Sequence, residues 1–246
     1  MVCIKRVPDT ESRLRIAGDG TSIETAGIKF VISPYDEYAL ETALRLRDAA
    51  GGGEVVVITV GDTASGEQLR AALAMGADGA ILLKGEPTLD GLATARALAA
   101  ALEGAAPDLV LAGMKAADDD QQQVGAMLAQ LLHLPCITVV AKLEVDGSTV
   151  RAHREIEGGV EHVEAPLPAV VTITKGEFEP RLPSLKGIMA AKKKPLEEKP
   201  AALGSSRIKV HGLSYPPERP AGRIVGKGAE AVPELIRLLK EEARVL

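Results

Sequence analysis

The sequence predicts an α/β fold: a doubly wound, mostly parallel sheet, followed by an antiparallel hairpin region and an extended C-terminal arm. Short apolar runs alternate with helical stripes through the first two-thirds of the chain, an order typical of a parallel sheet with helices on both faces. Beyond Cys136 the apolar runs follow one another at hairpin spacing. Beyond Lys175 prolines replace regular periodicity, which indicates an arm.

The first strand and the first helix have clear boundaries in the sequence. Residues 2–7 form a short apolar run that a proline ends. Ser33 is a capping residue, Pro34 stands at the first helical position, and Asp36 supplies an acid three residues after the cap. We expect a helix that begins at Pro34 and ends at the glycines of residues 51–53.

The β–α alternation then continues. Residues 54–60 are a nearly continuous β-branched run, typical of a strand buried on both faces. Further strands are expected at residues 80–83 and 108–112, and helices at residues 69–75, 90–102 and 121–132. In such a sheet the ligand crevice lies at the carboxyl ends of the strands. The loops after Val7, Val60 and Ala112 should therefore share one edge.

The rest of the chain departs from this alternation. Short strands are expected at residues 138–143, 149–155, 160–164 and 169–173, with turns at the Asp-Gly and Gly-Gly pairs. A last helix is expected on the apolar stripe of Val232, Leu235, Ile236 and Leu239. Because a proline-rich arm buries little against itself, we expect residues 181–246 to lie on another surface, beside an α/β domain of residues 1–180.

Composition excludes several classes of function. The formal net charge of −5 argues against a general nucleic-acid binder, and the 2% of aromatic residues leaves no stacking platform for bases. No apolar run approaches the roughly 20 residues that span a bilayer, and the first residues lack a signal-peptide core. We expect no membrane insertion and a cytoplasmic location, or the mitochondrial matrix in a eukaryote.

The two cysteines predict buried thiols. Cys3 and Cys136 lie far apart, each in an apolar run, without CxxC spacing. The four histidines show no ligand spacing either. We therefore expect neither a disulfide nor a metal site.

The loop after the strand at residues 108–112 is the main candidate site. It carries three acids and three glutamines ahead of a helix: Asp118, Asp119, Asp120, Gln121, Gln122 and Gln123. Unsatisfied backbone N–H groups at a helix start favour a phosphate, and the polar side chains could hold a ribose and a base edge. Alternatively, the acids cap the helix and complement its dipole. Neither a GxxxxGK[ST] nor a GxGxxG sequence follows the first strand, so no phosphate-loop or dinucleotide fingerprint is present.

The whole chain resembles the β subunits of electron transfer flavoproteins. The similar segments are KRVPD, SPYDE, ALAMGAD, ADDDQQQVG, REIEGGVE and IMAAKKKP. The most specific stretch is residues 152–172, with Arg154, Glu157, Gly158, Gly159, Glu161, Val163, Pro168 and Thr172. The resemblance implies an adenine nucleotide alpha hydrolase-like, Rossmann-like fold.

The resemblance also implies an electron carrier with no catalysis of its own. In that family the β subunit pairs with an α subunit that holds most contacts to a redox-active FAD, while the β subunit buries a structural AMP. The heterodimer takes electrons from acyl-CoA and related dehydrogenases and passes them to a quinone oxidoreductase.

Matched motif by motif, the resemblance assigns the AMP to four segments of this chain. The residues are Cys3, Ser33, Pro34, Tyr35, Asp36, Val60, Gly113, Met114, Lys115, Asp118, Asp119, Asp120, Gln121, Gln122, Gln123 and Val124. Val124 lacks the hydroxyl of the threonine found in many relatives, so phosphate contacts there are made by the backbone or are absent. The Asp triplet favours the AMP-binding kind over an electron-bifurcating branch with a second FAD. Tyr35 either lies near the flavin ring or packs at the helix start.

A second set of residues resembles the family's partner contacts. Residues 183–189 resemble the recognition loop, in which Leu185 enters a pocket on the dehydrogenase, with Pro183, Ile188 and Met189 around it. The alternative is that Leu185 packs the arm down. Lys192, Lys193 and Lys194 either steer an acidic dehydrogenase surface or form a solvated run. Glu155 meets an arginine of the α subunit, or is an ordinary hairpin charge.

Two other classes remain as alternatives. A hydrolase or synthetase acting on adenine nucleotides would carry a Gly-rich loop after the first strand, where this chain has Val7-Pro8-Asp9-Thr10. A stand-alone nucleotide-sensing module would need neither the arm nor the lysine run.

Overall fold

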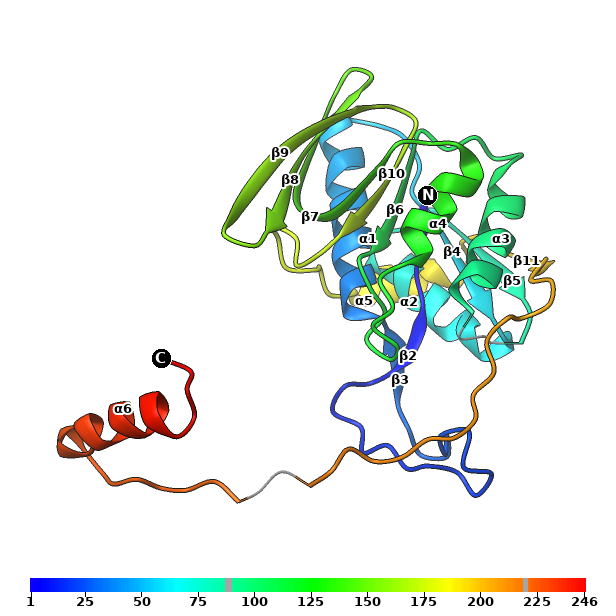
Figure 1. Cartoon of the computed structure of the whole chain (residues 1–246). Helices are drawn as coiled ribbons and strands as arrows, with labels where there is room; N and C mark the ends of the chain where they lie inside the picture. Colours follow the sequence, from blue (N-terminus) through cyan, green and yellow to red (C-terminus); the bar gives the residue numbers. More distant parts are fainter. Residues whose placement is uncertain (87–89, 219–220) are drawn as a thin grey trace.

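A computed structural model describes residues 1–86, 90–218 and 221–246 and contains one large, mostly parallel sheet (Figure 1). Its strand order is β11-β5-β4-β1-β6-β10-β7-β8-β9. The strands are β1 (Val2–Cys3), β4 (Val56–Gly61), β5 (Gly79–Lys84), β6 (Leu109–Gly113), β7 (Cys136–Asp146), β8 (Thr149–Ile156), β9 (Gly159–Pro166), β10 (Ala169–Ile173) and β11 (Leu196–Pro200). The predicted α/β class and mostly parallel sheet are confirmed.

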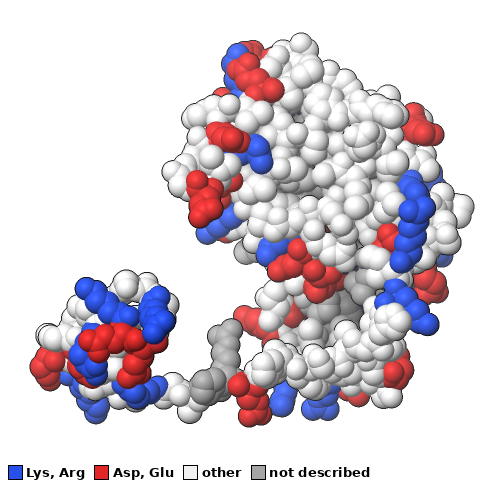
Figure 2. Space-filling model, viewed as in Figure 1, with Lys and Arg blue, Asp and Glu red and all other residues white. Residues whose placement is uncertain are grey.

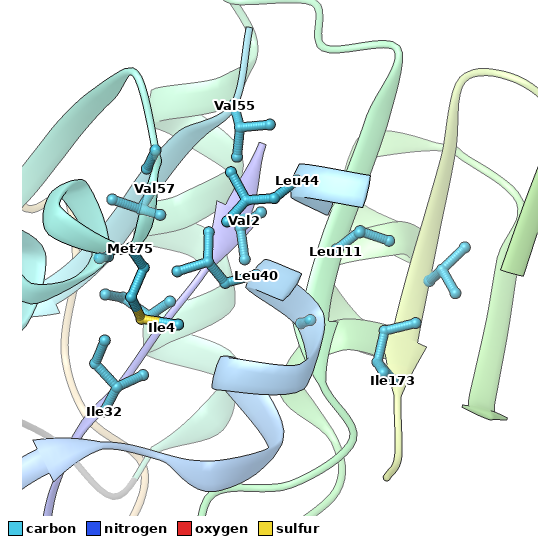
Figure 3. Packing of buried hydrophobic residues seen from close by; sticks show 14 of the residues in the cluster. Val2, Ile4, Ile32, Leu40, Leu44, Val55, Val57, Met75, Leu111 and Ile173 are labelled. Carbon is cyan, nitrogen blue, oxygen red and sulfur yellow. The ribbon is translucent and has the colours of Figure 1, made fainter. Parts of the chain in front are cut away.

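Helices cover both faces of this sheet (Figure 1). They are α1 (Pro34–Ala50), α2 (Gly66–Met75) after the 3-10 turn η1 (Thr63–Ser65), α3 (Gly91–Leu102), α4 (Val124–Leu132), α5 (Leu185–Ala191) and α6 (Val232–Glu241) after η2 (Ala229–Ala231). Because successive strand side chains point to opposite faces, Val2 and Cys3 enter different cores. Val2 packs with α1 and α2, and Figure 3 shows Leu40 and Leu44 of α1 turned toward it. Cys3 packs with α3 and α4 on the other face.

The first strand is shorter than predicted. Only β1 joins the large sheet. The last contact of this run with the sheet is the hydrogen bond from the Ile4 N–H to the Ile58 carbonyl at 2.9 Å, and the chain then departs from the sheet. The rest of the apolar run forms β2 (Arg6–Pro8), which pairs antiparallel with β3 (Phe30–Ile32) in a separate two-stranded sheet. Cys3, and not Val7, therefore lies where the first strand ends at the common edge.

Two helix starts show where local signals succeed and fail. Helix α1 begins at Pro34 and ends at Gly51 in a left-handed conformation, as predicted. The Ser33 hydroxyl does not cap it, and accepts a hydrogen bond from the Ala117 N–H at 3.3 Å instead. Helix α4 begins at Val124, three residues later than expected, because Asp120 and Gln122 have positive φ angles that no helix accepts.

The predicted antiparallel hairpins form over three strands, whereas residues 169–173, also expected in that region, form β10 in the parallel part of the sheet. Strands β7, β8 and β9 make an antiparallel ribbon. Strand β10 then lies between β6 and β7, parallel to both. Thr172 of β10 accepts a hydrogen bond from the Val139 N–H at 3.2 Å, at a bulge in the neighbouring strand. The ribbon is therefore continuous with the sheet that carries the candidate site.

Two elements of the arm had no periodic signal in the sequence. Helix α5 packs on α2, and β11 pairs parallel with β5 at the far edge of the large sheet. The last helix, α6, stands apart from this body (Figure 1). Figure 2 shows charged side chains of both signs gathered on that helix, whereas the visible face of the α/β body is mostly uncharged.

The prediction of buried thiols is half right. Cys3 is buried, whereas Cys136, the first residue of β7, is exposed. Both thiols are free. Burial raises the pKa of Cys3 to about 12, so its thiol stays protonated in the core.

Candidate functional site

The carboxyl ends of β1, β4 and β6 lie side by side. Cys3 is in register with Ile58 of β4 on one side and with Ala112 of β6 on the other. All three strands end within a few residues of Cys3, and the first turn of α1 lies over these strand ends. This edge is where a doubly wound sheet binds its ligand.

Asp36 joins the ends of two strands. Its Oδ2 accepts from the Lys5 N–H and its Oδ1 from the Gly113 N–H, both at 2.8 Å. Burial raises the pKa of Asp36 to about 7, against the two backbone hydrogen bonds that favour the carboxylate. A Cβ on Gly113 would lie 2.5 Å from Asp36 Oδ1, so only glycine allows this close approach. Asp36 therefore fixes the geometry of the edge.

The three acids of the loop pair with lysines. Lys5 Nζ donates to Asp118 Oδ1 at 2.8 Å and to Asp119 Oδ2 at 2.9 Å, and Lys115 Nζ donates to Asp120 Oδ2 at 2.9 Å. No side chain caps α4, whose N-cap residue is Gln123. The alternative that these acids cap the helix is therefore wrong. Two lysines face three carboxylates, so the negative charge of the acids is partly compensated and their repulsion of a nearby anion is reduced.

The start of α4 is set by close packing. A Cβ on Gly125 would lie 2.3 Å from Thr172 Cγ2, so the glycine lets the helix touch β10. The Gln123 amide donates to the Gln121 side chain, and its Nε2 lies 2.8 Å from where a Cβ on Gly91 would be. The first backbone N–H groups of a helix have no carbonyl of their own helix to bond. They remain as donors at this edge.

The other predicted residues lie around the same edge. Val60 is half-buried near the end of β4, and Tyr35 is half-buried in the first turn of α1. Lys115 Nζ lies 5.8 Å from the centre of the Tyr35 ring, while the Met114 N–H bonds to the Ile173 carbonyl at 2.8 Å. The four segments assigned to AMP are thus brought together by the fold.

Sequence reasoning did not list Lys5 among the site residues. Its hydrogen bonds to Asp118 and Asp119 raise its pKa above the usual value, although burial by itself would lower it. The available signal was the KRVPD motif, which places a cation directly after the first strand.

The residues present fit an adenine mononucleotide. The α4 start offers backbone donors for a phosphate, and the charge of the neighbouring carboxylates is partly compensated by Lys5. Glutamine side chains and strand-end backbone groups supply both donors and acceptors for a ribose and a base.

A second candidate surface lies on α5. Ser184 caps this helix by accepting from the Gly187 N–H at 3.0 Å. Leu185 is 85% exposed, and Pro183, Ile188 and Met189 are exposed beside it. The alternative that Leu185 packs the arm onto its own chain is therefore wrong. An exposed apolar group on a fixed helix is a suitable interface anchor.

The charged residues assigned to partners differ in their surroundings. Lys192 and Lys193 are exposed, whereas Lys194 is half-buried and donates to the Leu73 carbonyl of α2 and to the Ala77 carbonyl just beyond it. Glu155 is exposed near the end of β8, opposite Val160 of β9.

Two kinds of feature are absent from residues 1–86, 90–218 and 221–246. No helix there is long and apolar enough to cross a membrane. No group of three or more His, Cys, Asp and Glu side chains there is placed to hold a metal ion.

The sequence matches known proteins over its whole length. A family model described as "Electron transfer flavoprotein domain" matches residues 21–203. A protein of Bradyrhizobium diazoefficiens named electron transfer flavoprotein subunit beta is 42% identical over 246 residues, covering 100% of this chain and 99% of the relative. Proteins of the same name are 40% identical in Bacillus subtilis and 38% identical in Homo sapiens, each covering 100% of this chain and 98% of the relative.

Proposed function

The chain belongs to the family of electron transfer flavoprotein β subunits, and on that premise we propose that it binds a structural AMP, pairs with an α subunit and docks electron-donating dehydrogenases. The family is one of electron-carrying flavoproteins. The finer roles are proposals, and each has its own support in the contacts of this chain.

The observation that carries the AMP proposal is the uncapped start of α4 beside acids that are paired with lysines. Backbone N–H groups of Val124 and Gly125 are suited to the phosphate. Lys5 binds the carboxylates of Asp118 and Asp119, which reduces their repulsion of a phosphate there. Gln121, Gln122 and Gln123, with the strand ends at Cys3 and Val60, would enclose the nucleoside.

AMP supplies no redox chemistry here, and the FAD that we propose the α subunit mostly holds supplies the one- and two-electron steps. The proposed role of this chain is to help position that FAD. Tyr35 stands at the open end of the edge, with the Lys115 ammonium 5.8 Å from its ring centre. An aromatic side chain at that place could contact a flavin ring from the α subunit.

The α subunit is the proposed partner for the apolar surface of the arm. Val232, Leu235 and Ile236 are exposed on one side of α6, and the helix stands apart from the body (Figure 1). An amphipathic helix with an exposed apolar stripe is stabilised by covering that stripe. Glu155, on the ribbon, is the proposed partner of an α-subunit arginine.

Acyl-CoA and related dehydrogenases are the proposed partners of α5. Leu185 would enter a pocket of the dehydrogenase, and the exposed Lys192 and Lys193 would steer an acidic surface toward it. The reduced heterodimer would then pass electrons to a quinone oxidoreductase. The cytoplasm, or the mitochondrial matrix in a eukaryote, is the proposed compartment.

Counting released nucleotides tests the proposal. We expect the denatured α/β heterodimer to release one AMP and one FAD, measured by chromatography against standards. Two FAD and no AMP would place the chain in the electron-bifurcating branch. A chain that elutes as a monomer from gel filtration in the presence of its α subunit would contradict the carrier proposal.

The docking role is tested by Leu185→Ala in the heterodimer. We expect reduction by the dehydrogenase to slow by about tenfold or more, because a buried interface anchor is worth about 2 kcal/mol. Flavin and AMP content should not change. Leu182→Ala removes a neighbouring side chain that is 89% exposed and should have a smaller effect. Unchanged reduction kinetics for Leu185→Ala would rule out the anchor role.

A further inference from the structure

Helices α2 and α5 cap each other's carboxyl ends. Arg70 of α2 donates through Nη1 to the Ala191 carbonyl at 2.7 Å and to the Lys194 carbonyl at 2.9 Å. Lys194, just beyond α5, donates through Nζ to the Leu73 carbonyl at 3.1 Å and to the Ala77 carbonyl at 2.5 Å. Cations at helix carboxyl ends satisfy orphan carbonyls and complement the helix dipole.

The contact between the two helices is close enough to fix their distance. A Cβ on Gly187 would lie 2.4 Å from the Ala74 carbonyl oxygen, so α5 rests directly on the backbone of α2. Ala191 is buried in the same contact. On the outer side Leu185 and Met189 remain 85% and 67% exposed. The orientation of α5 on α2 thus determines how these two side chains are presented.

Helix α5 depends on this support. It spans seven residues, and a helix of that length is not stable alone in water. If the caps were lost, the fraction of molecules with an ordered α5 would fall, and the apparent affinity for any partner of Leu185 would fall by the same factor.

We propose that Lys194 and Arg70 are positioning residues for dehydrogenase docking, which hold α5 so that Leu185 is presented already ordered. The inference rests on the proposed docking role of Leu185. It gives the lysine run two functions: Lys192 and Lys193 face solvent and act by charge, while Lys194 faces α2 and acts by holding the helix.

The neighbouring lysines supply a matched pair for the test. Lys193→Met and Lys194→Met each remove one positive charge from the same run, and only Lys194 bonds to α2. KM for the heterodimer and kcat are measured with an acyl-CoA dehydrogenase at several ionic strengths. We expect Lys194→Met to raise KM about tenfold more than Lys193→Met, because charge-assisted hydrogen bonds are lost, with kcat unchanged. Equal KM values in the two variants would overturn the inference.

A double-variant cycle identifies the route of the effect. In a Leu185→Ala background the additional KM increase of Lys194→Met should disappear, because the ordered helix then has no anchor to present. Arg70→Met should reproduce the KM increase of Lys194→Met. If Leu185→Ala leaves KM unchanged, the docking proposal itself fails. If Leu185→Ala raises KM while Lys194→Met equals Lys193→Met, docking stands and the positioning role fails.

A measurement on the unaltered heterodimer covers the case in which Lys194→Met does not assemble. Amide hydrogen exchange in α5 should be slow, starting with the Ile188 N–H that bonds to the Ser184 carbonyl at 2.9 Å. Exchange at the rate of an unstructured chain would show that α5 is not ordered before docking, and would overturn the inference.

Discussion

Arg181 places three donors on the carboxylate of Glu41: its main-chain N–H at 3.1 Å, Nε at 2.8 Å and Nη2 at 3.2 Å. Glu41 is only 1% exposed, in the middle of α1, and also accepts from Arg45 Nε at 2.6 Å. Burial acts to raise the pKa of Glu41, and the hydrogen bonds from Arg181 outweigh it, so the pKa is lowered. Arg181 thereby fastens to α1 the segment that leads into α5.

Glu41→Gln should destabilise the protein by about 2 kcal/mol, because Arg181 loses its buried counter-charge and keeps only the more exposed Asp48 carboxylate at 3.4 Å. Because folding lowers the pKa of Glu41, the ionised carboxylate stabilises the folded protein above pH 4.5, the pKa of the group in the unfolded chain. This stabilisation is lost as the pH falls further. Urea unfolding should show that the variant loses less stability below that pH than the parent. Glu67→Gln, at an exposed position of α2, is the control and should change little.

Asp36→Asn tests the strand-end bridge. The pKa of Asp36 is raised from 3.8 to about 7, so the folded state binds more protons than the unfolded state across that range. Its contribution to stability is therefore complete below pH 3.8 and is lost as pH rises toward 7. The variant should show a flatter pH dependence of unfolding free energy in this window. An unchanged slope would mean that Asp36 is not the titrating group.

Gly125→Ala should displace the start of α4. Its new methyl group would lie 2.3 Å from Thr172 Cγ2, and overpacking of this kind costs about 1–3 kcal/mol. We expect reduced AMP content in the purified heterodimer together with a lower unfolding free energy. Gly66→Ala is the matched control, because it lies at the start of α2 with nothing within 4 Å of its Cβ position. Full AMP content in Gly125→Ala would contradict the placement of the phosphate.

Lys5→Met should weaken AMP binding by about tenfold or more, because it frees the carboxylates of Asp118 and Asp119 beside the proposed phosphate position. Calorimetric titration of nucleotide-free protein with AMP measures this effect. Lys115→Met removes the same charge from the more exposed Asp120 and should weaken binding less. An equal loss in the two variants would indicate a general charge effect.

The parts of the fold that the sequence predicted depend on local signals. Pro34 and Gly51 bound α1 because proline favours a first helical turn and glycine a left-handed end. Strands such as β4 were readable because burial on both faces requires an unbroken apolar run. The class of sheet follows from these elements alone.

Long-range partners explain what was missed. The Ser33 hydroxyl, Asp118 and Asp119 were assigned to nearby helix starts, whereas their partners, Ala117 and Lys5, come from distant parts of the chain. Helix α5 and strand β11 are short, and β11 is mostly charged. Helix α5 forms because it packs on α2, and β11 forms because it pairs with β5. The residue pattern within each short segment contains no sign of these long-range contacts.

Strand β11 also affects how the protein behaves in concentrated solution. It covers the edge of β5, an apolar strand whose unpaired N–H and C=O groups would otherwise be open to another chain. Its own outer edge carries Glu197, Glu198 and Lys199 and ends at Pro200, residues that discourage pairing with a further strand. Since β11 follows directly from the segment capped by Arg70, detachment of that segment would uncover β5. The arm that carries the proposed docking helix therefore also covers an open edge of the sheet, which protects the protein against aggregation.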